Sequence, residues 1–215
     1  MAVRFSIDSD LRFLSHHDMM RLFERALSRA QLPVKFSEGF NPRPRLSLPL
    51  PRPVGIASVA ELLLLELSEP LDSETVLRRL GAQLPDGVCL TTCCVFTGKR
   101  PPQPITAVYT VDLPPEHYSV VGDRLERLMR SPVFHVERVD HRTKALKTVD
   151  IRAYLVTAEM DGGVVTWTAR ITGAGTARPQ EFLSALGLDP VVWLHHVRRQ
   201  AVTWQDESLF AAPEA

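Results

Sequence analysis

A proline-rich segment near the middle of the chain sets the strongest limit on what the chain can fold into. Lys99–Pro104 reads KRPPQP, and proline fixes its own backbone angle and cannot donate to a strand ladder. The segment follows an apolar stretch and precedes the strand-like ITAVYTVDL, so residues 98–104 are predicted to be a linker. This linker divides the 215 residues into two halves, each the size of a small domain.

The first half, residues 1–97, has the pattern of a β-α-β-β-α-β unit. A helix is predicted to begin at Ser15, because apolar residues from Met19 to Ala30 fall on one helical face and arginines largely on the other. A second helix is predicted from Asp72 or Ser73 to about Gln83. The predicted strands and extended segments are Val3–Ile7, Val34–Ser37, Arg45–Leu50, Ala60–Leu67 and Val88–Thr97. This order is typical of a ferredoxin-like unit.

The second half, residues 105–204, repeats this order more loosely. Helices are predicted at His117–Arg130 and Pro179–Leu186, and the turn Asp161–Gly163 predicts a hairpin. The predicted strands are Ile105–Leu113, Phe134–Val139, Ile151–Glu159, Val164–Ile171 and Trp193–Trp204. We therefore predict an α+β protein built from two tandem ferredoxin-like (βαββαβ) units. The tail, residues 205–215, is acidic and is predicted to be mobile.

Composition excludes several classes of protein. A hydrophobic fraction of 45% is sufficient for a core and argues against global disorder. No apolar run approaches the roughly 18 residues of a membrane-spanning helix, and the N-terminus lacks the apolar stretch of a signal peptide. Three cysteines, two of them adjacent, cannot form a secreted disulfide framework. We therefore expect a cytoplasmic protein that does not enter the membrane.

The equal numbers of basic and acidic residues, 25 of each, conceal an uneven distribution. Residues 1–59 hold nine Lys or Arg against five acidic residues, whereas residues 60–97 hold two against six. The segment 138–152 is again basic, with Arg138, Arg142, Lys144, Lys147 and Arg152. If the two basic segments share a face, they form a polyanion-binding surface. The alternative is that they are ordinary solvated charges.

A turn at Glu38–Pro42 is the densest candidate motif. Gly39 permits a positive φ, and Phe40 can present an aromatic face at an exposed turn. Ferredoxin-like sheets that bind RNA combine aromatic stacking with cationic groups, and Arg43 and Arg45 lie beside this turn. The alternative is that Phe40 fills the domain core.

The residues from Phe13 to Glu61 also carry a resemblance to a known family. The matching positions are Phe13, Leu14, Ser15, His16, Asp18, Arg25, Ala26, Leu32, Pro33, Glu38, Gly39, Phe40, Asn41, Pro42, Pro44, Gly55 and Glu61. With Val149–Arg152 and Arg178-Pro179, they resemble the radical-SAM-associated protein family of unknown function. The resemblance covers most of the chain and departs at His17, usually apolar, and at Arg43, often histidine. It implies a radical SAM protein as partner, and it implies no established activity.

The predicted binding surface combines these motifs with the basic segments and requires no cofactor and no metal. Its residues are Arg12, Ser15, His16, Asp18, Arg25, Glu38, Gly39, Phe40, Asn41, Pro42, Arg43, Arg45, Arg142, Lys144, Lys147, Asp150 and Arg152.

His16 and the cysteines invite catalytic interpretations. The first turn of a helix suits a general base, but spacing supplies no second acid–base group, so we favour a capping or packing role for His16. Cys89, Cys93 and Cys94 lack the spacing of a radical SAM cluster. In a regular strand, Cys89 and Cys93 would share one face and Cys94 the other. The chain is therefore not expected to be a radical SAM enzyme itself.

Three hypotheses follow. The first is a non-catalytic RNA-binding or substrate-presenting module that acts with a radical SAM protein, possibly on RNA or the ribosome. The second is a metal-independent RNA-processing enzyme that uses His16. The third is a protein-docking subunit without nucleic-acid contact, and its partner surface is the acidic face or the tail.

Overall fold

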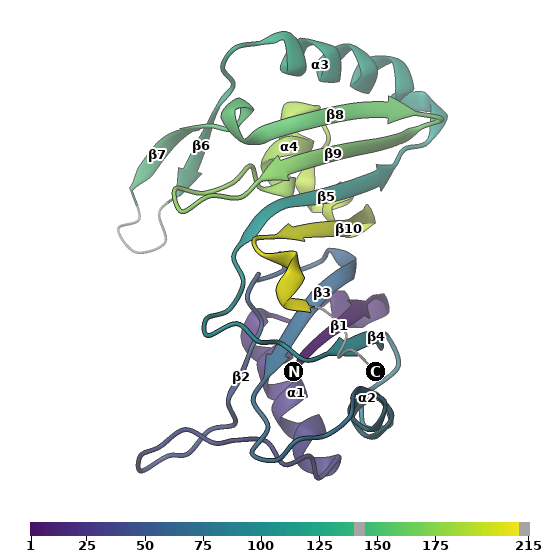
Figure 1. Ribbon diagram of the computed structural model, residues 1–215. Coiled ribbons are helices and arrows are strands. Elements are labelled where there is room, and N and C mark those ends of the chain that lie inside the picture. The colour runs from purple at the N-terminus through teal and green to yellow at the C-terminus, as the bar shows by residue number, and fades with distance from the viewer. Residues whose placement is uncertain (140–144, 211–215) are drawn as a thin grey trace. The chain divides into compact units, whose positions relative to one another are not determined.

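The computed structural model describes residues 1–139 and 145–210, which adopt a mixed α+β fold with antiparallel strand pairing (Figure 1). The chain divides into two compact units. Unit 1 comprises residues 1–104 together with 203–215, and unit 2 comprises residues 105–202. The division after Pro104 falls at the end of the proline-rich segment.

Unit 1 contains a sheet in the order β4-β1-β3, with β2 paired to the other edge of β3. Strand β1 is antiparallel to both β3 and β4, and β2 is antiparallel to β3. Its elements are β1 (Ala2–Ile7), η1 (Ser9–Phe13), α1 (His16–Arg29), β2 (Leu46–Ser47), β3 (Ala57–Leu65), α2 (Ser73–Gly81) and β4 (Val88–Cys94).

Helices α1 and α2 begin where side chains cap them. The Ser15 hydroxyl accepts from the Asp18 backbone N–H, and Asp72 accepts from the backbone N–H of Thr75. Each cap satisfies one of the backbone donors that a helix start leaves unpaired. The sequence prediction of both helix starts is therefore confirmed.

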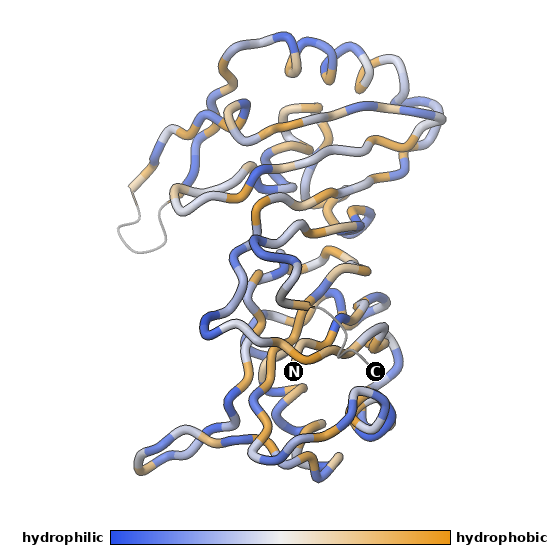
Figure 2. The backbone as a smooth tube through the Cα atoms, viewed as in Figure 1, coloured by the Kyte–Doolittle hydropathy of each residue, from blue (hydrophilic) through white to orange (hydrophobic). Residues whose placement is uncertain are grey.

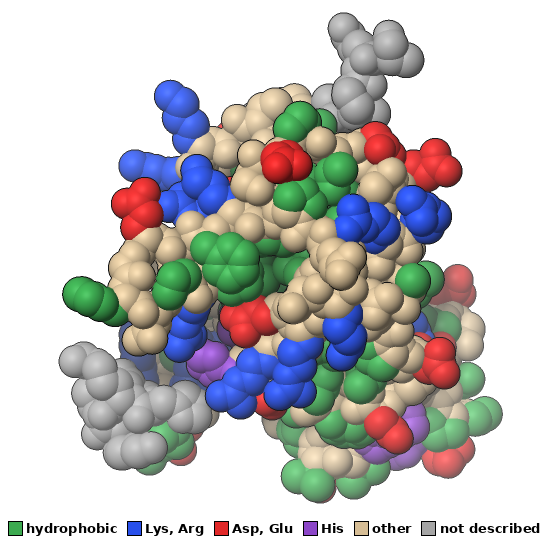
Figure 3. All heavy atoms as spheres, turned by 90° about the horizontal axis from the view of Figure 1, so that it is seen from below, with side chains coloured by type: hydrophobic (Ala, Val, Ile, Leu, Met, Phe, Trp, Pro, Cys, Tyr) green, Lys and Arg blue, Asp and Glu red, His purple; other side chains and the backbone are tan. Residues whose placement is uncertain are grey.

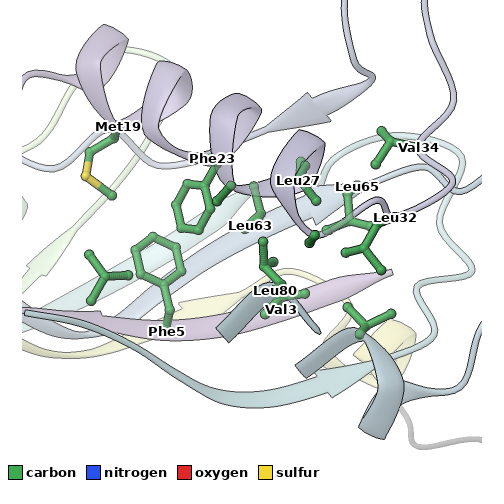
Figure 4. Close-up of a cluster of buried hydrophobic side chains, with 14 of the residues drawn as sticks. Val3, Phe5, Met19, Phe23, Leu27, Leu32, Val34, Leu63, Leu65 and Leu80 are labelled. Atoms are coloured by element: carbon green, nitrogen blue, oxygen red, sulfur yellow. The ribbon is translucent and has the colours of Figure 1, made fainter. Parts of the chain in front are cut away.

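The core of unit 1 lies between these helices and one face of the sheet. Figure 4 shows Met19, Phe23 and Leu27 of α1 pointing toward β1 and β3. The rings of Phe5 and Phe23 meet edge to face, with centroids 4.9 Å apart. Figure 2 shows the hydrophobic colour along β1 and β3, as expected of strands whose side chains are largely buried.

Unit 2 contains a sheet in the order β10-β5-β9-β8 and a separate antiparallel pair, β6 with β7. Strand β9 is antiparallel to both β5 and β8. Its elements are β5 (Pro104–Asp112), η2 (Pro115–His117), α3 (Tyr118–Arg130), β6 (His135–Val139), β7 (Leu146–Asp150), η3 (Arg152–Tyr154), β8 (Leu155–Asp161), β9 (Val164–Arg170), α4 (Pro179–Ala185), α5 (Pro190–Trp193), η4 (Leu194–His196) and β10 (Val197–Trp204).

Three sequence predictions in unit 2 are corrected. Strand β7 was not predicted, because it is short and largely exposed and pairs with β6 alone, so it lacks the apolar alternation of a half-buried strand. Strand β8 begins at Leu155, since Asp150 and η3 make a turn before it. The final strand begins at Val197 rather than Trp193, because Asp189 caps a helical turn and Pro190 occupies its first position. His195 and His196 therefore lie in η4, with ring centroids 4.1 Å apart.

The described part of the predicted tail includes a short 3₁₀ segment, η5 (Glu207–Phe210). The Phe210 ring lies 5.7 Å from the Phe96 ring, and the Arg4 guanidinium lies 5.1 Å from its centroid. Residues 211–215 are outside the described residues.

Candidate nucleic-acid interface

An extended arm, residues 35–45, leaves unit 1 between α1 and β2 (Figure 1). The backbone N–H of Arg45 donates to the Lys35 carbonyl at 2.7 Å, and that of Ser37 donates to the Arg43 carbonyl at 2.8 Å. The Ser37 hydroxyl accepts from the Arg43 N–H at 3.0 Å. At the base, the Lys35 N–H bonds to the Glu66 carbonyl at 2.8 Å. The two sides of the arm are therefore held together by backbone pairing rather than by an apolar core.

The tip of the arm presents aromatic side chains to solvent. Phe40 is fully exposed, at 104% of its reference area, and Phe36 is 53% exposed. Gly39 has a φ of +125°, which glycine adopts at little cost, so the chain reverses at this position without strain. This exposure excludes the alternative in which Phe40 fills the core. Both rings are therefore accessible to a ligand in solution.

The arm also carries cations beside these rings. Lys35 and Arg43 are exposed and form no ion pair with a described residue, whereas Arg45 pairs with Glu66 at 3.2 Å. Seen from below in Figure 3, Lys and Arg side chains lie near exposed hydrophobic side chains. Of the predicted arm residues, Glu38, Asn41 and Pro42 are also exposed, so the whole predicted motif is accessible.

Several predicted basic residues stabilise the fold instead of forming a free surface. Arg12 pairs with Asp8 at 2.7 Å and donates to the Ser9 carbonyl at 2.8 Å. Arg152 donates to the carbonyls of Met129 and Leu155, at 3.2 and 2.9 Å. These side chains tie neighbouring segments together, so the predicted basic surface is smaller than the sequence indicates.

Ser15 caps α1, and Asp18 lies in the first turn of this helix, where it also lines a groove. The Ser15 hydroxyl donates to Asp18 Oδ2 at 2.6 Å and accepts from the Asp18 N–H at 3.2 Å. The hydrogen bond from Ser15 lowers the pKa of the Asp18 carboxyl below its ordinary value. Both residues were predicted to be binding residues, and their contacts account for them structurally.

His16 begins α1 and is half-buried beside Phe5, Met19, Arg52 and Glu61. The cavity between these side chains measures about 10 Å³, which is room for at most one water molecule. A cavity of this size cannot admit a nucleotide, so this side of His16 offers no active site for RNA.

A groove on unit 1 lies along the exposed side of α1 and measures about 580 Å³. Arg21, Arg25 and Arg29 line it at intervals of four residues, which places their Cα atoms about 6 Å apart along the helix axis. The apolar part of its lining comprises Leu11, Leu14, Leu22 and Leu84. Asp18 and Arg25 of this lining were among the predicted site residues, and the spacing of the three arginines was a usable signal for Arg21 and Arg29.

The predicted residues of the second basic segment are only partly described. Arg142 and Lys144 lie outside the described residues. Lys147 and Asp150 line a pocket of unit 2 with residues that the prediction left out, chiefly Arg138, Tyr154 and Arg178. Arg178 precedes the Pro179 that starts α4, and the Arg178-Pro179 pair was the available signal.

The cysteines do not form a cluster. A bulge in β4, opposite Arg4 and Phe5, breaks the strand alternation, so Cys93 pairs with Val3 and packs against the core. Cys89 pairs with Ser6 and is exposed, which corrects the prediction that it shares a face with Cys93. Burial raises the pKa of the Cys93 thiol. Within residues 1–139 and 145–210, no group of three His, Cys, Asp or Glu side chains could hold a metal ion.

Comparison with known proteins supplies a family. The family model described as an uncharacterized protein conserved in bacteria (DUF2344) matches residues 1–179. The chain belongs to this family. The matched region of the family includes the arm, the α1 groove, and β6 and β7. No curated protein matches the chain. None of the helices in the described parts of the chain has both the length and the apolar character that crossing a bilayer requires.

Proposed function

We propose that this protein is a non-catalytic module that binds RNA or presents a substrate, and that it acts with a radical SAM protein in the cytoplasm. The observation that carries the RNA-binding proposal is the fully exposed Phe40 at the tip of an arm that also presents Lys35 and Arg43. The partner and the compartment rest on the sequence resemblance and on the sequence composition.

The chemistry of single-stranded RNA supports this assignment. Every base has a π face that stacks on an aromatic ring, and each stacked base contributes about 1–3 kcal/mol to binding. Lys35 and Arg43 supply positive charge for the phosphates that follow the stacked bases. An arm with paired backbones holds these side chains away from the body of the unit, where a flexible strand can reach them.

We further propose that both units are ferredoxin-like. In unit 1 the strand order β4-β1-β3-β2 supports this, as does the antiparallel pairing of β1 with β3 and β4. In unit 2 the order β10-β5-β9-β8 supports it, with β6 and β7 as an insertion after α3. Ferredoxin-like domains are frequent RNA-binding scaffolds, which agrees with the proposed function.

Binding of a fluorescent single-stranded RNA by the wild-type protein and the Phe40→Ala variant tests the RNA-binding proposal. The wild type is expected to bind, with affinity that falls steeply as the salt concentration rises. Phe40→Ala is expected to weaken binding about 5- to 150-fold, because one stacking platform is lost. Val191→Ala is the matched control, since Val191 is also highly exposed but lies outside the arm. Wild-type binding that is absent or indifferent to salt overturns the proposal.

A second candidate function, docking to the radical SAM partner, is favoured by the α1 groove. The groove combines an apolar lining with three arginines whose backbone positions are about 6 Å apart along α1, and carboxylates four residues apart on a helix have the same spacing. Arg21 pairs with Asp18 at 3.9 Å and Arg29 donates to the Gln83 carbonyl at 2.8 Å, whereas Arg25 forms no ion pair with a described residue. An acidic amphipathic helix of the partner therefore fits this surface. Co-purification of the partner with the wild type, and its loss with Arg25→Glu, is the expected result. Co-purification that survives this charge reversal contradicts docking at the groove.

A further inference from the structure

A pocket of about 550 Å³ lies within unit 2, at the β6–β7 pair. Its volume falls in the range typical of small-molecule sites. One wall consists of β6 and β7 residues, and the rest comes from η3, Ala174 and Arg178. The RNA-binding proposal for the arm makes no use of this pocket.

Arg138 is anchored firmly in the pocket wall. Its Nε and Nη2 atoms donate to the Glu181 carboxylate at 2.8 and 2.7 Å, and Nη2 also donates to the Thr176 carbonyl. Both members of this ion pair are largely buried, with side chains 15% and 9% exposed. The third nitrogen, Nη1, lies near Gly175, where a Cβ would be 3.6 Å from it. The ion pair therefore fixes the guanidinium with one donor edge turned toward the Gly175 turn.

Two further cations line the same pocket without an internal counter-ion. Lys147 and Arg178 form no ion pair with a described residue. Tyr154 adds a hydroxyl group to the lining, and this hydroxyl lies 3.6 Å from the Cβ position of Gly175. Cationic and hydroxyl donors from separate segments thus surround one space.

The acidic residue of the lining is Asp150, and its carboxylate is already engaged. Its Oδ1 atom accepts from the backbone N–H groups of Phe134 and Arg152, at 2.9 and 3.0 Å. Glu181 is paired with Arg138 in the same way. After these pairings, the positive charges of Lys147 and Arg178 remain to attract an anion.

We propose that this pocket binds a phosphate monoester, carried either by a mononucleotide or by the 5′ end of an RNA. A carboxylate has two oxygens and is satisfied by a single arginine fork. A phosphate monoester has about two negative charges and three terminal oxygens, and it requires several donors from different directions. Arg138, Lys147, Arg178 and the Tyr154 hydroxyl provide that arrangement.

Titration with AMP, adenosine and inorganic phosphate tests the site. AMP and inorganic phosphate are expected to bind, and adenosine is not. Lys147→Gln and Arg178→Gln are each expected to weaken AMP binding about tenfold or more, because each removes one charge-assisted contact. Arg170→Gln is the matched control, since Arg170 is exposed in unit 2 but does not line the pocket.

A second measurement distinguishes the two sources of the phosphate. If the site accepts RNA ends, 5′-phosphorylated RNA binds more tightly than the same RNA with a 5′-hydroxyl, and Lys147→Gln removes the difference. If the ligand is a free nucleotide, AMP binds and the two RNAs do not differ. Equal binding of AMP and adenosine, or equal AMP affinity in the wild type and both variants, overturns the proposal. Phe40→Ala is expected to bind AMP with wild-type affinity. A failure of RNA binding by the arm can therefore be distinguished from a failure of phosphate binding by the pocket.

Discussion

The arm of unit 1 and the pocket of unit 2 both present cationic and aromatic side chains, but different contacts hold these side chains in place. The arm holds Phe40 and Arg43 in solvent through backbone pairing and one hydrogen bond from the Arg43 N–H to the Ser37 hydroxyl. The pocket holds Arg138 through a largely buried, two-bond ion pair with Glu181. An exposed aromatic surface can stack on many bases, whereas a concave cationic surface selects a compact anion. We therefore expect the way these side chains are held, more than their residue types, to determine which ligand each region recognises.

The largest predicted effect concerns stability and falls on unit 2. Replacing Arg138 with Met leaves the Glu181 carboxylate buried without its partner, and loss of one member of a buried pair costs about 3 kcal/mol or more. Urea unfolding of Arg138→Met and of Phe40→Ala measures the contrast. Phe40→Ala is expected to unfold within about 0.5 kcal/mol of the wild type, because Phe40 makes no core contact. Equal losses in both variants contradict the distinction between the two supports.

The second effect concerns the salt dependence of RNA binding by the arm. Each phosphate contact contributes about 0.7 to the slope of log affinity against log salt for single strands. The Lys35→Gln/Arg43→Gln double variant is therefore expected to reduce this slope by about 1.4. The Lys147→Gln/Arg178→Gln double variant in unit 2 also removes two positive charges, serves as the charge-matched control and leaves the slope for 5′-hydroxyl RNA unchanged. If the Lys35→Gln/Arg43→Gln double variant has the same slope as the wild type, Lys35 and Arg43 do not contact the RNA phosphates.

A third, smaller effect separates capping from binding. Ser15→Ala removes the N-cap of α1 and is expected to lower the free energy of unfolding by about 1 kcal/mol. RNA and AMP affinities should remain at wild-type values, since Ser15 contacts the helix start rather than either site. If a folded Ser15→Ala protein loses RNA affinity, Ser15 belongs to the binding surface.

The hydrogen bonds between Ser15 and Asp18 also predict that the stability of the protein depends on pH. Because the folded pKa of Asp18 is lowered, its contribution to stability is present above the unfolded pKa, near pH 4, and is lost as the pH falls through the folded pKa. Unfolding midpoints at pH 6 and pH 3 measure this, with Asp18→Asn as the control that lacks the carboxyl. The wild type should lose more stability than Asp18→Asn over this interval, and equal losses contradict the assignment.

The smallest effect concerns cysteine reactivity. Cys89 is exposed, whereas Cys93 is half-buried against the core and its pKa is raised by burial. Iodoacetamide at neutral pH is therefore expected to label Cys89 faster than Cys93, because the thiolate is the reactive form. Mass spectrometry of the alkylated peptides measures both rates, and faster labelling of Cys93 contradicts the bulged register of β4.

The sequence predicts local features of this fold well where a local signal determines them. Ser15 and Asp72 mark the starts of α1 and α2, because a few adjacent residues determine a helix cap. Strand β7 and the bulge in β4 were missed because they depend on pairing with β6 and β1, which lie elsewhere in the chain.

The candidate sites show the same limit. The exposed turn around Phe40 follows from its glycine and prolines, so it was predicted from the sequence. Arg152 was not recognisable as engaged, because it bonds to the carbonyl of Met129, which only the folded chain brings near. Arg12 bonds to the nearby Asp8 and Ser9, so its pairing was a local signal that the prediction did not use. The charge of whole segments therefore predicted a larger basic surface than the structure has. The pocket residues Arg138 and Tyr154 could be recognised only from tertiary contacts.

The most direct test of the account measures two ligands on two variants. Phe40→Ala is expected to lose affinity for a 5′-hydroxyl single-stranded RNA and to bind AMP as tightly as the wild type. Lys147→Gln is expected to show the reverse pattern. The account is contradicted if Phe40→Ala binds this RNA with wild-type affinity, or if either variant loses both ligands together while it remains folded.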